Sequence, residues 1–223
     1  IGGTAQPYSS RCRQGCSRAN EDIFCLMNVY LDVDRTLFDT DLFDTLRWQL
    51  LEREYGVDVA ERQRQPTFYS YRDDMWFYDF SAHMKDMGLP VDEVYERVRC
   101  SELADGRLEY PGVRELVEWV QTCGVVRLLT YGADDYQRLK VALCPSLQGL
   151  ETIVTQSGKG RLFRSQALAR PAWMVDDKPI GGELPAGVQF IQVDFSGAHG
   201  KKTEAWPVVT SLQNVLEVLQ KSN

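Results

Sequence analysis

The stretch Val29-Tyr30-Leu31-Asp32-Val33-Asp34-Arg35-Thr36-Leu37 decides how the rest of the chain is interpreted. It begins as an apolar run and then carries two carboxylates one residue apart, which is typical of a buried strand with polar residues at its end. Alternate side chains of a strand share a face, so Asp32 and Asp34 start out pointing the same way. Two crowded carboxylates repel each other unless a cation or a shared proton offsets their charge. The stretch therefore indicates either a capped strand end that leads into a helix or a divalent-metal site.

The sequence around this stretch divides into three parts. Residues 1–26 are rich in Gly, Ser and Arg and poor in apolar residues, which predicts a flexible N-terminal arm. Residues 40–108 carry apolar residues at helical spacing and predict an all-helical insertion. Residues 27–39 and 109–223 alternate helices with nearly continuous apolar strands. This alternation predicts an α/β core with a parallel sheet that is covered by helices on both faces.

Polar residues stand where the predicted core strands end. In an open parallel sheet the site lies at the carboxyl ends of the strands, so these residues are expected to converge at one edge. They are Asp32 and Asp34 after the first strand, Thr130 after the second, Asp176 and Asp177 after a later one, and Lys159 in a glycine-flanked loop.

Two of these carboxylates have distinct roles if the substrate is a phosphate ester. Asp32 can attack phosphorus and form an aspartyl phosphate, which divides one difficult step into two easier ones. Asp34 can protonate the leaving oxygen and then deprotonate the attacking water. The pair therefore predicts a nucleophile and a general acid/base.

The remaining residues would balance charge. Mg²⁺ prefers oxygen ligands and often shares them with a substrate phosphate, and Asp176 and Asp177 would help to hold it. Thr130 and Lys159 would neutralise the phosphoryl oxygens in the transition state. The expected cofactor is therefore Mg²⁺, and the expected partner is a small phosphorylated substrate.

The ordered set of motifs resembles the haloacid dehalogenase superfamily of phosphohydrolases. The resemblance covers most of the chain beyond the arm and rests on four matches, which fall at residues 30–37, residues 125–130, Lys159 and residues 174–177. It implies a Rossmann-like core with an inserted helical cap of the C1 type. It also implies that Asp32 and Asp177 bind Mg²⁺ by their side chains, Asp34 by its backbone carbonyl, and Asp176 directly or through water.

Several positions leave alternatives open within this resemblance. Asp34 favours phosphatase or phosphomutase activity, because dehalogenating members of the family lack a second aspartate there. Arg35 replaces a small residue, often glycine, and could contact substrate or point to solvent. The spacing from Lys159 to the acidic pair is short for the family. Lys140 and Lys178 are therefore alternative phosphate-binding lysines, although Lys140 lies in the middle of a predicted helix and is expected at the surface.

The composition limits the class of partner. The chain has 223 residues and a formal net charge of -7, which argues against a nucleic acid or a membrane surface as the main partner. Its six cysteines are scattered, which is typical of a reducing compartment, so a cytoplasmic location is expected. The oligomeric state stays open between monomer and dimer.

We expect a Mg²⁺-dependent phosphomonoester hydrolase that acts on a small phosphorylated metabolite through an aspartyl phosphate. The alternatives are a phosphomutase or phosphotransferase of the same fold and a catalytically silent phosphate-binding protein. Asp32, Asp34 and Asp177 are all intact, which counts against the silent alternative. Most aromatic residues of the insertion are expected to pack within it, while the candidates to face a cleft and select the substrate are Tyr69, Tyr71, Arg72 and Trp76.

Overall fold

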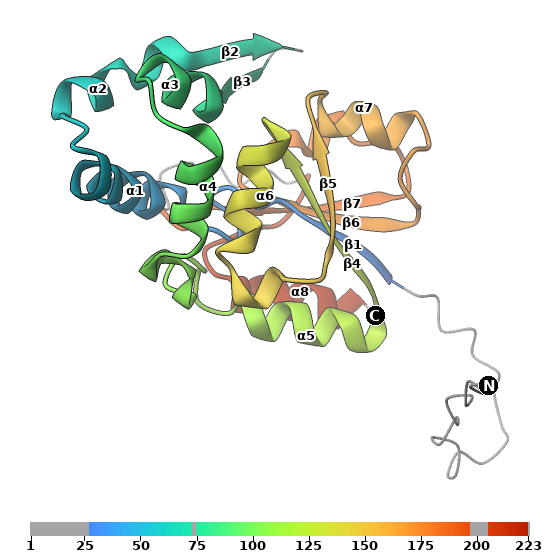
Figure 1. Ribbon diagram of the computed structural model, residues 1–223. Helices are drawn as coiled ribbons and strands as arrows, with labels where there is room; N and C mark the ends of the chain where they lie inside the picture. The colour runs from blue at the N-terminus through green and yellow to red at the C-terminus, as the bar shows by residue number, and fades with distance from the viewer. Residues whose placement is uncertain (1–26, 73–74, 197–204, 223) are drawn as a thin grey trace, which may run out of the picture.

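The core of the protein is a six-stranded parallel sheet. The computed structural model describes residues 27–72, 75–196 and 205–222, so the expected N-terminal arm lies outside the described residues. The strand order is β5-β4-β1-β6-β7-β8, and all neighbouring strands run parallel (Figure 1). The strands are β1 (Met27–Leu31), β4 (Gly124–Tyr131), β5 (Glu151–Thr155), β6 (Ala172–Asp176), β7 (Val188–Val193) and β8 (Val208–Val209).

The central strand β1 is buried on both faces of the sheet. Val29 and Leu31 belong to the larger apolar cluster, whereas Tyr30 belongs to a second cluster. All three side chains are at most 1% exposed. Burial on both faces explains why this strand is apolar at successive positions instead of alternating with polar residues.

Helices supply the apolar partners of both faces. The larger cluster contains residues of α5 (Val113–Cys123), α6 (Asp134–Ala142) and α8 (Leu212–Ser222). On the other face, Phe163 of α7 (Lys159–Arg164) meets the Tyr30 ring edge-on, with ring centroids 5.1 Å apart. Two short 3-10 helices, η3 (Pro145–Leu147) and η4 (Ile180–Glu183), complete the core. The predicted α/β fold class with a parallel sheet is confirmed.

Between β1 and β4 the chain forms an insertion, which Figure 1 shows beyond the carboxyl ends of the central strands. Its α-helices are α1 (Thr40–Tyr55), α2 (Val59–Arg64), α3 (Phe80–Asp86) and α4 (Val91–Arg99). The 3-10 helices η1 (Gln65–Phe68) and η2 (Glu102–Asp105) and the strands β2 (Tyr69–Arg72) and β3 (Met75–Tyr78) make up the rest. Throughout the described part of the chain, no helix combines the length and apolar character needed to cross a lipid bilayer.

The prediction of an all-helical insertion needs a correction in one segment. Strands β2 and β3 form an antiparallel ribbon in which Tyr69 is opposite Tyr78 and Tyr71 is opposite Trp76. The ring centroids of these two pairs lie 5.5 Å and 4.9 Å apart. Aromatic side chains favour strands and stabilise each other across a strand pair. In this segment the cross-strand pairs outweigh the helical spacing of the apolar residues.

A buried arginine joins the insertion to the core. Arg47 of α1 is fully buried and donates to the hydroxyl of Tyr136 on α6 at 2.6 Å. A second guanidinium nitrogen donates to Asp44 Oδ1 at 2.5 Å. The guanidinium carbon lies 5.0 Å from the ring centroid of Phe80 and 5.1 Å from that of Tyr78, within reach of cation–π attraction. The insertion is thereby anchored on α6, next to the carboxyl ends of the strands.

Candidate active site

A tight turn after β1 separates the two carboxylates of the opening motif. The backbone N–H groups of Leu37 and Phe38 both donate to the carbonyl of Val33 at 3.0 Å, which folds residues 33–38 into one compact turn. Arg35 has a φ of 57° in this turn, a left-handed conformation that glycine adopts most easily. Because the turn curls the backbone directly after the strand, Asp32 and Asp34 meet different neighbours.

Asp32 lies in a buried cluster of charges at the strand ends. Carboxylate oxygens of Asp32, Asp176 and Asp177 all lie within 4.8 Å of one another. The Lys159 ammonium donates to Asp32 Oδ1 and, at 2.6 Å, to Asp176 Oδ2. The Thr36 hydroxyl donates to the other oxygen of Asp32 at 3.3 Å. Lys159 thus contacts two of the three carboxylates, while the positive charge that acts on Asp177 is that of Lys178.

The carboxylates of this cluster are short of positive charge. Burial, together with the charges of Asp32 and Asp176, raises the pKa of Asp177 to about 8. Burial also raises the pKa of Asp32 to about 6, although Lys159 opposes the rise. Burial disfavours the Lys159 ammonium, but the neighbouring carboxylates outweigh this effect and raise its pKa. Three oxygen donors with uncompensated negative charge fit a hard divalent cation such as Mg²⁺.

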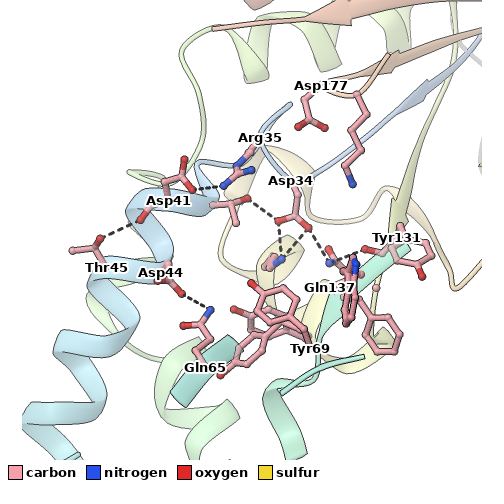
Figure 2. Close-up of a pocket in the computed structure, with 18 of the residues that line it drawn as sticks. Asp34, Arg35, Asp41, Asp44, Thr45, Gln65, Tyr69, Tyr131, Gln137 and Asp177 are labelled. Carbon is pink, nitrogen blue, oxygen red and sulfur yellow. Dashed lines mark hydrogen bonds and ion pairs between the residues drawn. The ribbon is translucent and has the colours of Figure 1, made fainter. Parts of the chain in front are cut away.

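Asp34 has a separate set of partners (Figure 2). Its carboxylate accepts from the Thr40 hydroxyl at 2.7 Å and from the Gln137 side-chain amide at 2.9 Å. The Lys140 ammonium contacts both oxygens, at 2.6 Å and 2.9 Å. Burial opposes ionisation of Asp34, but the charge and hydrogen bonds of Lys140, with those of Thr40 and Gln137, lower its pKa below the ordinary value. Asp177 lies apart from these contacts in Figure 2.

Thr130 belongs to the same hydrogen-bond network as Asp34 but does not contact it directly. It is fully buried near the end of β4, and its hydroxyl donates to Gln137 Oε1 at 3.0 Å. The amide nitrogen of Gln137 donates to Asp34 and, at 3.1 Å, to the carbonyl of Tyr131. Thr130 is therefore linked to the carboxylate of Asp34 through a single side chain.

Two adjoining cavities meet at this site. The smaller one has a volume of about 60 Å³, and both Asp32 and Asp34 line it. The larger one has a volume of about 410 Å³ and extends between the core and the insertion, with Tyr69 and Trp76 of the β2–β3 ribbon in its wall. Asp34, Tyr131 and Lys178 line both cavities. Asp34 therefore stands where a group in the small cavity would join the rest of a ligand in the large one.

Comparison with known proteins addresses the fold. No protein-family model matches the chain, and a search of curated proteins finds no match either. Solved structures do match. A protein from Burkholderia xenovorans LB400 assigned as a haloacid dehalogenase-like hydrolase has a TM-score of 0.63 at 17% identity, covering 86% of this chain and 96% of its own. The chain has the haloacid dehalogenase fold.

Two further structures with this fold are similar over most of their length. A protein from Bacillus subtilis assigned as a HAD-hydrolase and bound to magnesium has a TM-score of 0.55 at 18% identity, covering 87% of this chain and 98% of its own. A protein from Thermotoga maritima assigned as a β-phosphoglucomutase has a TM-score of 0.54 at 16% identity, covering 88% of this chain and 99% of its own. The Rossmann-like core expected from the resemblance is confirmed.

Within the haloacid dehalogenase fold, the candidate residues fall into two groups. Asp32, Asp176, Asp177 and Lys159 lie together, whereas Asp34 directs its carboxylate to α6 and α1. Two expectations about lysines need correction. Lys159 is the first residue of α7 instead of a loop residue.

The prediction that Lys140 lies at the surface is wrong. Its side chain is only 5% exposed because α6 turns this residue toward Asp34. Gln137 lies three residues earlier on the same helix and contacts the same carboxylate. Residues at this spacing share a helix face, so the spacing of Gln137 and Lys140 after the second motif is the sequence signal for this pair of contacts. Thr40, at the start of α1, was also missed.

Proposed function

We propose that the protein is a Mg²⁺-dependent phosphomonoester hydrolase that acts through an aspartyl phosphate. The observation that carries the proposal is that Asp32 and Asp34 line one small cavity but have different partners. Two carboxylates with separate partners can take different roles in one reaction, and the lowered pKa of Asp34 keeps it ionised, as a general base must be. A cavity of about 60 Å³ has room for a group the size of a few water molecules, as a phosphoryl group is.

In the proposed reaction, Asp32 is the nucleophile. Lys159 orients its carboxylate, and Thr36 holds the second oxygen. A bond from Asp32 to phosphorus forms as the bond to the leaving oxygen breaks. When bound, Mg²⁺ would lower the repulsion between the anionic nucleophile and the anionic phosphate. The residues that would hold it are Asp32 and Asp177, with Asp176 beside them.

Asp34 handles protons in both half-reactions. It lies at the junction of the two cavities, where the leaving oxygen of a substrate would pass from one to the other. It gives a proton to that oxygen in the first half-reaction. In the second it takes a proton from the water that attacks the aspartyl phosphate, which returns Asp32 as a carboxylate and releases inorganic phosphate. The proton taken from water in the second half-reaction equals the one given to the leaving oxygen in the first, so protons balance over the cycle.

The larger cavity supports a small phosphorylated metabolite as the substrate. We propose that the insertion acts as a cap over the sheet and that the non-reacting part of the substrate lies between cap and core. Aromatic and carboxylate side chains line this space together, among them Trp76, Tyr69 and Asp44. Such a wall suits a substrate with hydroxyl or amino groups attached to a flat or apolar frame.

Release of phosphate from p-nitrophenyl phosphate, with Mg²⁺ and with EDTA, tests the proposal. We expect turnover of the parent protein to require Mg²⁺ and to vanish in Asp32→Asn, while the exposed Asp92→Asn serves as a matched control and stays active. Equal turnover of Asp32→Asn and the parent would show that Asp32 is not the nucleophile. A phosphorylated organic product in place of free phosphate would point to phosphoryl transfer between organic molecules.

A further inference from the structure

Lys140 is a buried cation in an unusual place. It lies in α6, a helix that borders the active site but carries none of the residues predicted to react. Its side chain is 5% exposed, and its ammonium contacts both oxygens of Asp34, at 2.6 Å and 2.9 Å. A buried ammonium needs such a partner, because an unpaired charge is expensive away from water. Lys140 and Asp34 therefore hold each other in a single arrangement.

The Tyr136 ring restrains the position of the Lys140 ammonium. Its ammonium lies 4.5 Å from the ring centroid of Tyr136, one helical turn earlier on α6, which is within the range of a cation–π interaction. The hydroxyl of Tyr136 accepts from the buried Arg47 of α1 at 2.6 Å. The ring that supports Lys140 is thus anchored by the residue that joins the insertion to the core.

Gln137 and Thr40 complete the restraint on Asp34. Gln137 comes from the same helix as Lys140, and its amide nitrogen is fixed by a second bond to the carbonyl of Tyr131. Thr40 donates to Asp34 from the first turn of α1, on the side of the insertion. The carboxylate is therefore restrained from two directions, and only 28% of its side chain stays exposed. That exposed part faces the two cavities.

We propose that Lys140 is a positioning residue that holds the carboxylate of Asp34 toward the junction of the two cavities, ready to activate the water that attacks the aspartyl phosphate. The inference rests on the proposed function, because it assumes that Asp34 serves as the general base. Without Lys140, only the hydrogen bonds from Thr40 and Gln137 hold the carboxylate, and it can turn toward solvent more easily. Attack of water on the aspartyl phosphate then slows, because its base is misplaced.

The two half-reactions depend on Lys140 to different degrees. With p-nitrophenyl phosphate, Asp32 attacks phosphorus and p-nitrophenolate leaves as a stable anion, so this half-reaction needs little help from Asp34. In the second half-reaction, water attacks phosphorus, its proton goes to Asp34, and the bond between phosphorus and Asp32 breaks. A general base contributes about 10²–10⁴-fold to such a step. A Lys140 variant keeps Asp34 but loses its orientation, so we expect the rate of this step to fall by about one to two orders of magnitude.

Rapid-mixing kinetics of Lys140→Met with p-nitrophenyl phosphate and Mg²⁺ tests the inference. We expect a burst of p-nitrophenol close to one equivalent per enzyme at the parent's rate, followed by a steady state about 10–100-fold slower than that of the parent. Acid quenching should trap more phosphorylated protein than in the parent. The control is Arg138→Met on the same helix, whose ion pair with Asp134 is exposed, and it should match the parent in both phases.

Lys140→Arg keeps the test decisive if Lys140→Met does not fold. The guanidinium retains the charge but cannot place its donors as the ammonium does, so we expect the burst to persist and the steady state to fall less than in Lys140→Met. Equal slowing of both phases in the folded variants, or parent-like kinetics in Lys140→Met, would overturn the inference.

The outcome also separates this inference from the proposed function. If Asp32→Asn is inactive and Lys140→Met behaves as the parent, only the role of Lys140 fails. If the parent turns over neither p-nitrophenyl phosphate nor the smaller acetyl phosphate, or if Asp32→Asn stays active, the proposed function fails and the inference fails with it.

Discussion

Replacing Lys159 by methionine would measure how strongly the fold depends on the cation between its buried carboxylates. The side chains of Lys159, Asp32 and Asp176 are 7%, 6% and 1% exposed. Removing one partner of a buried ion pair costs about 3–5 kcal/mol, because the remaining charge is left uncompensated. Here two carboxylates would lose their cation, and a third, Asp177, lies within 4.8 Å of both.

Proton uptake sets an upper limit on this loss. Keeping a carboxyl of ordinary pKa 3.8 neutral costs about 4.4 kcal/mol near pH 7 and about 1.6 kcal/mol near pH 5, at about 1.36 kcal/mol per pH unit. We therefore expect Lys159→Met to lose about 3–4 kcal/mol near pH 7 and less than that near pH 5. The deficit shrinks on acidification because the loss of Lys159 removes the charge that opposes protonation of Asp32, so the folded variant binds more protons in this range than the folded parent.

Thermal unfolding in EDTA, followed by circular dichroism, is the assay. For a chain of this length each kcal/mol moves the Tm by about 2–4 °C. Lys159→Met should therefore unfold about 6–16 °C below the parent near pH 7, and by a smaller difference near pH 5. The matched control is Lys85→Met, an exposed lysine of α3 that should change stability by less than about 0.5 kcal/mol. A Lys159→Met protein with the parent's Tm near pH 7, or a deficit that grows on acidification, would refute the reasoning.

Two further predictions concern the insertion. The Tyr131 hydroxyl donates to the carbonyls of Arg72 at 2.7 Å and Met75 at 3.3 Å. Tyr131→Phe should therefore weaken the hold on the ribbon by about 1–2 kcal/mol and speed deuterium exchange in β2 and β3 by roughly tenfold; unchanged exchange would contradict this. Burial and the charge of Arg47 lower the pKa of His83 below 6.5, so the unfolded chain binds more protons than the folded one below that pH. The parent should lose more Tm between pH 7.5 and pH 5.5 than His83→Leu does, and an equal loss would show that His83 does not contribute.

The sheet and the carboxylate cluster could be predicted from the sequence because both follow from short-range patterns. The apolar run of β1 and its terminal carboxylates lie within one stretch of chain, and parallel strands bring their carboxyl ends to one edge whatever the loops do. Asp32 and Asp176 could therefore be expected at the same edge although they are far apart in the sequence. No feature of the insertion had to be known for this part of the prediction.

The β2–β3 ribbon could not be predicted from the sequence in the same way. Phe77, Phe80, Met84 and Met87 recur at helical spacing, but the first of them belongs to a strand and only the later ones follow the cap residue Asp79. A short apolar segment can satisfy both periods, and pairing with a partner strand decides between them. That partner, β2, alternates aromatic and polar residues in Tyr69-Ser70-Tyr71-Arg72, but it has only four residues and all of its side chains are exposed.

Arg35 shows how a departure from the family pattern can be explained once the backbone is known. The resemblance suggested a small residue, often glycine, at this position, and the φ of 57° supplies the reason. A non-glycine residue in this region costs roughly 1–2 kcal/mol. The Arg35 side chain donates to Asp41 at 2.7 Å, but both groups are exposed, so this pair offsets only part of the cost. Tertiary restraint of the turn must supply the rest.

The placement of two lysines explains how two nearby aspartates can serve different steps. If Asp32 and Asp34 shared one cation, they would lie side by side, and their repulsion would force one of them to hold a proton. The turn after β1 prevents this by sending each carboxylate to a different helix, Asp32 to Lys159 on α7 and Asp34 to Lys140 on α6. The two carboxylates then pair with different cations, although Lys159 also contacts Asp176, and both still line the small cavity. Substitutions at the two lysines should accordingly separate the half-reactions, with Lys140 governing release of the phosphoryl group and Lys159 its capture.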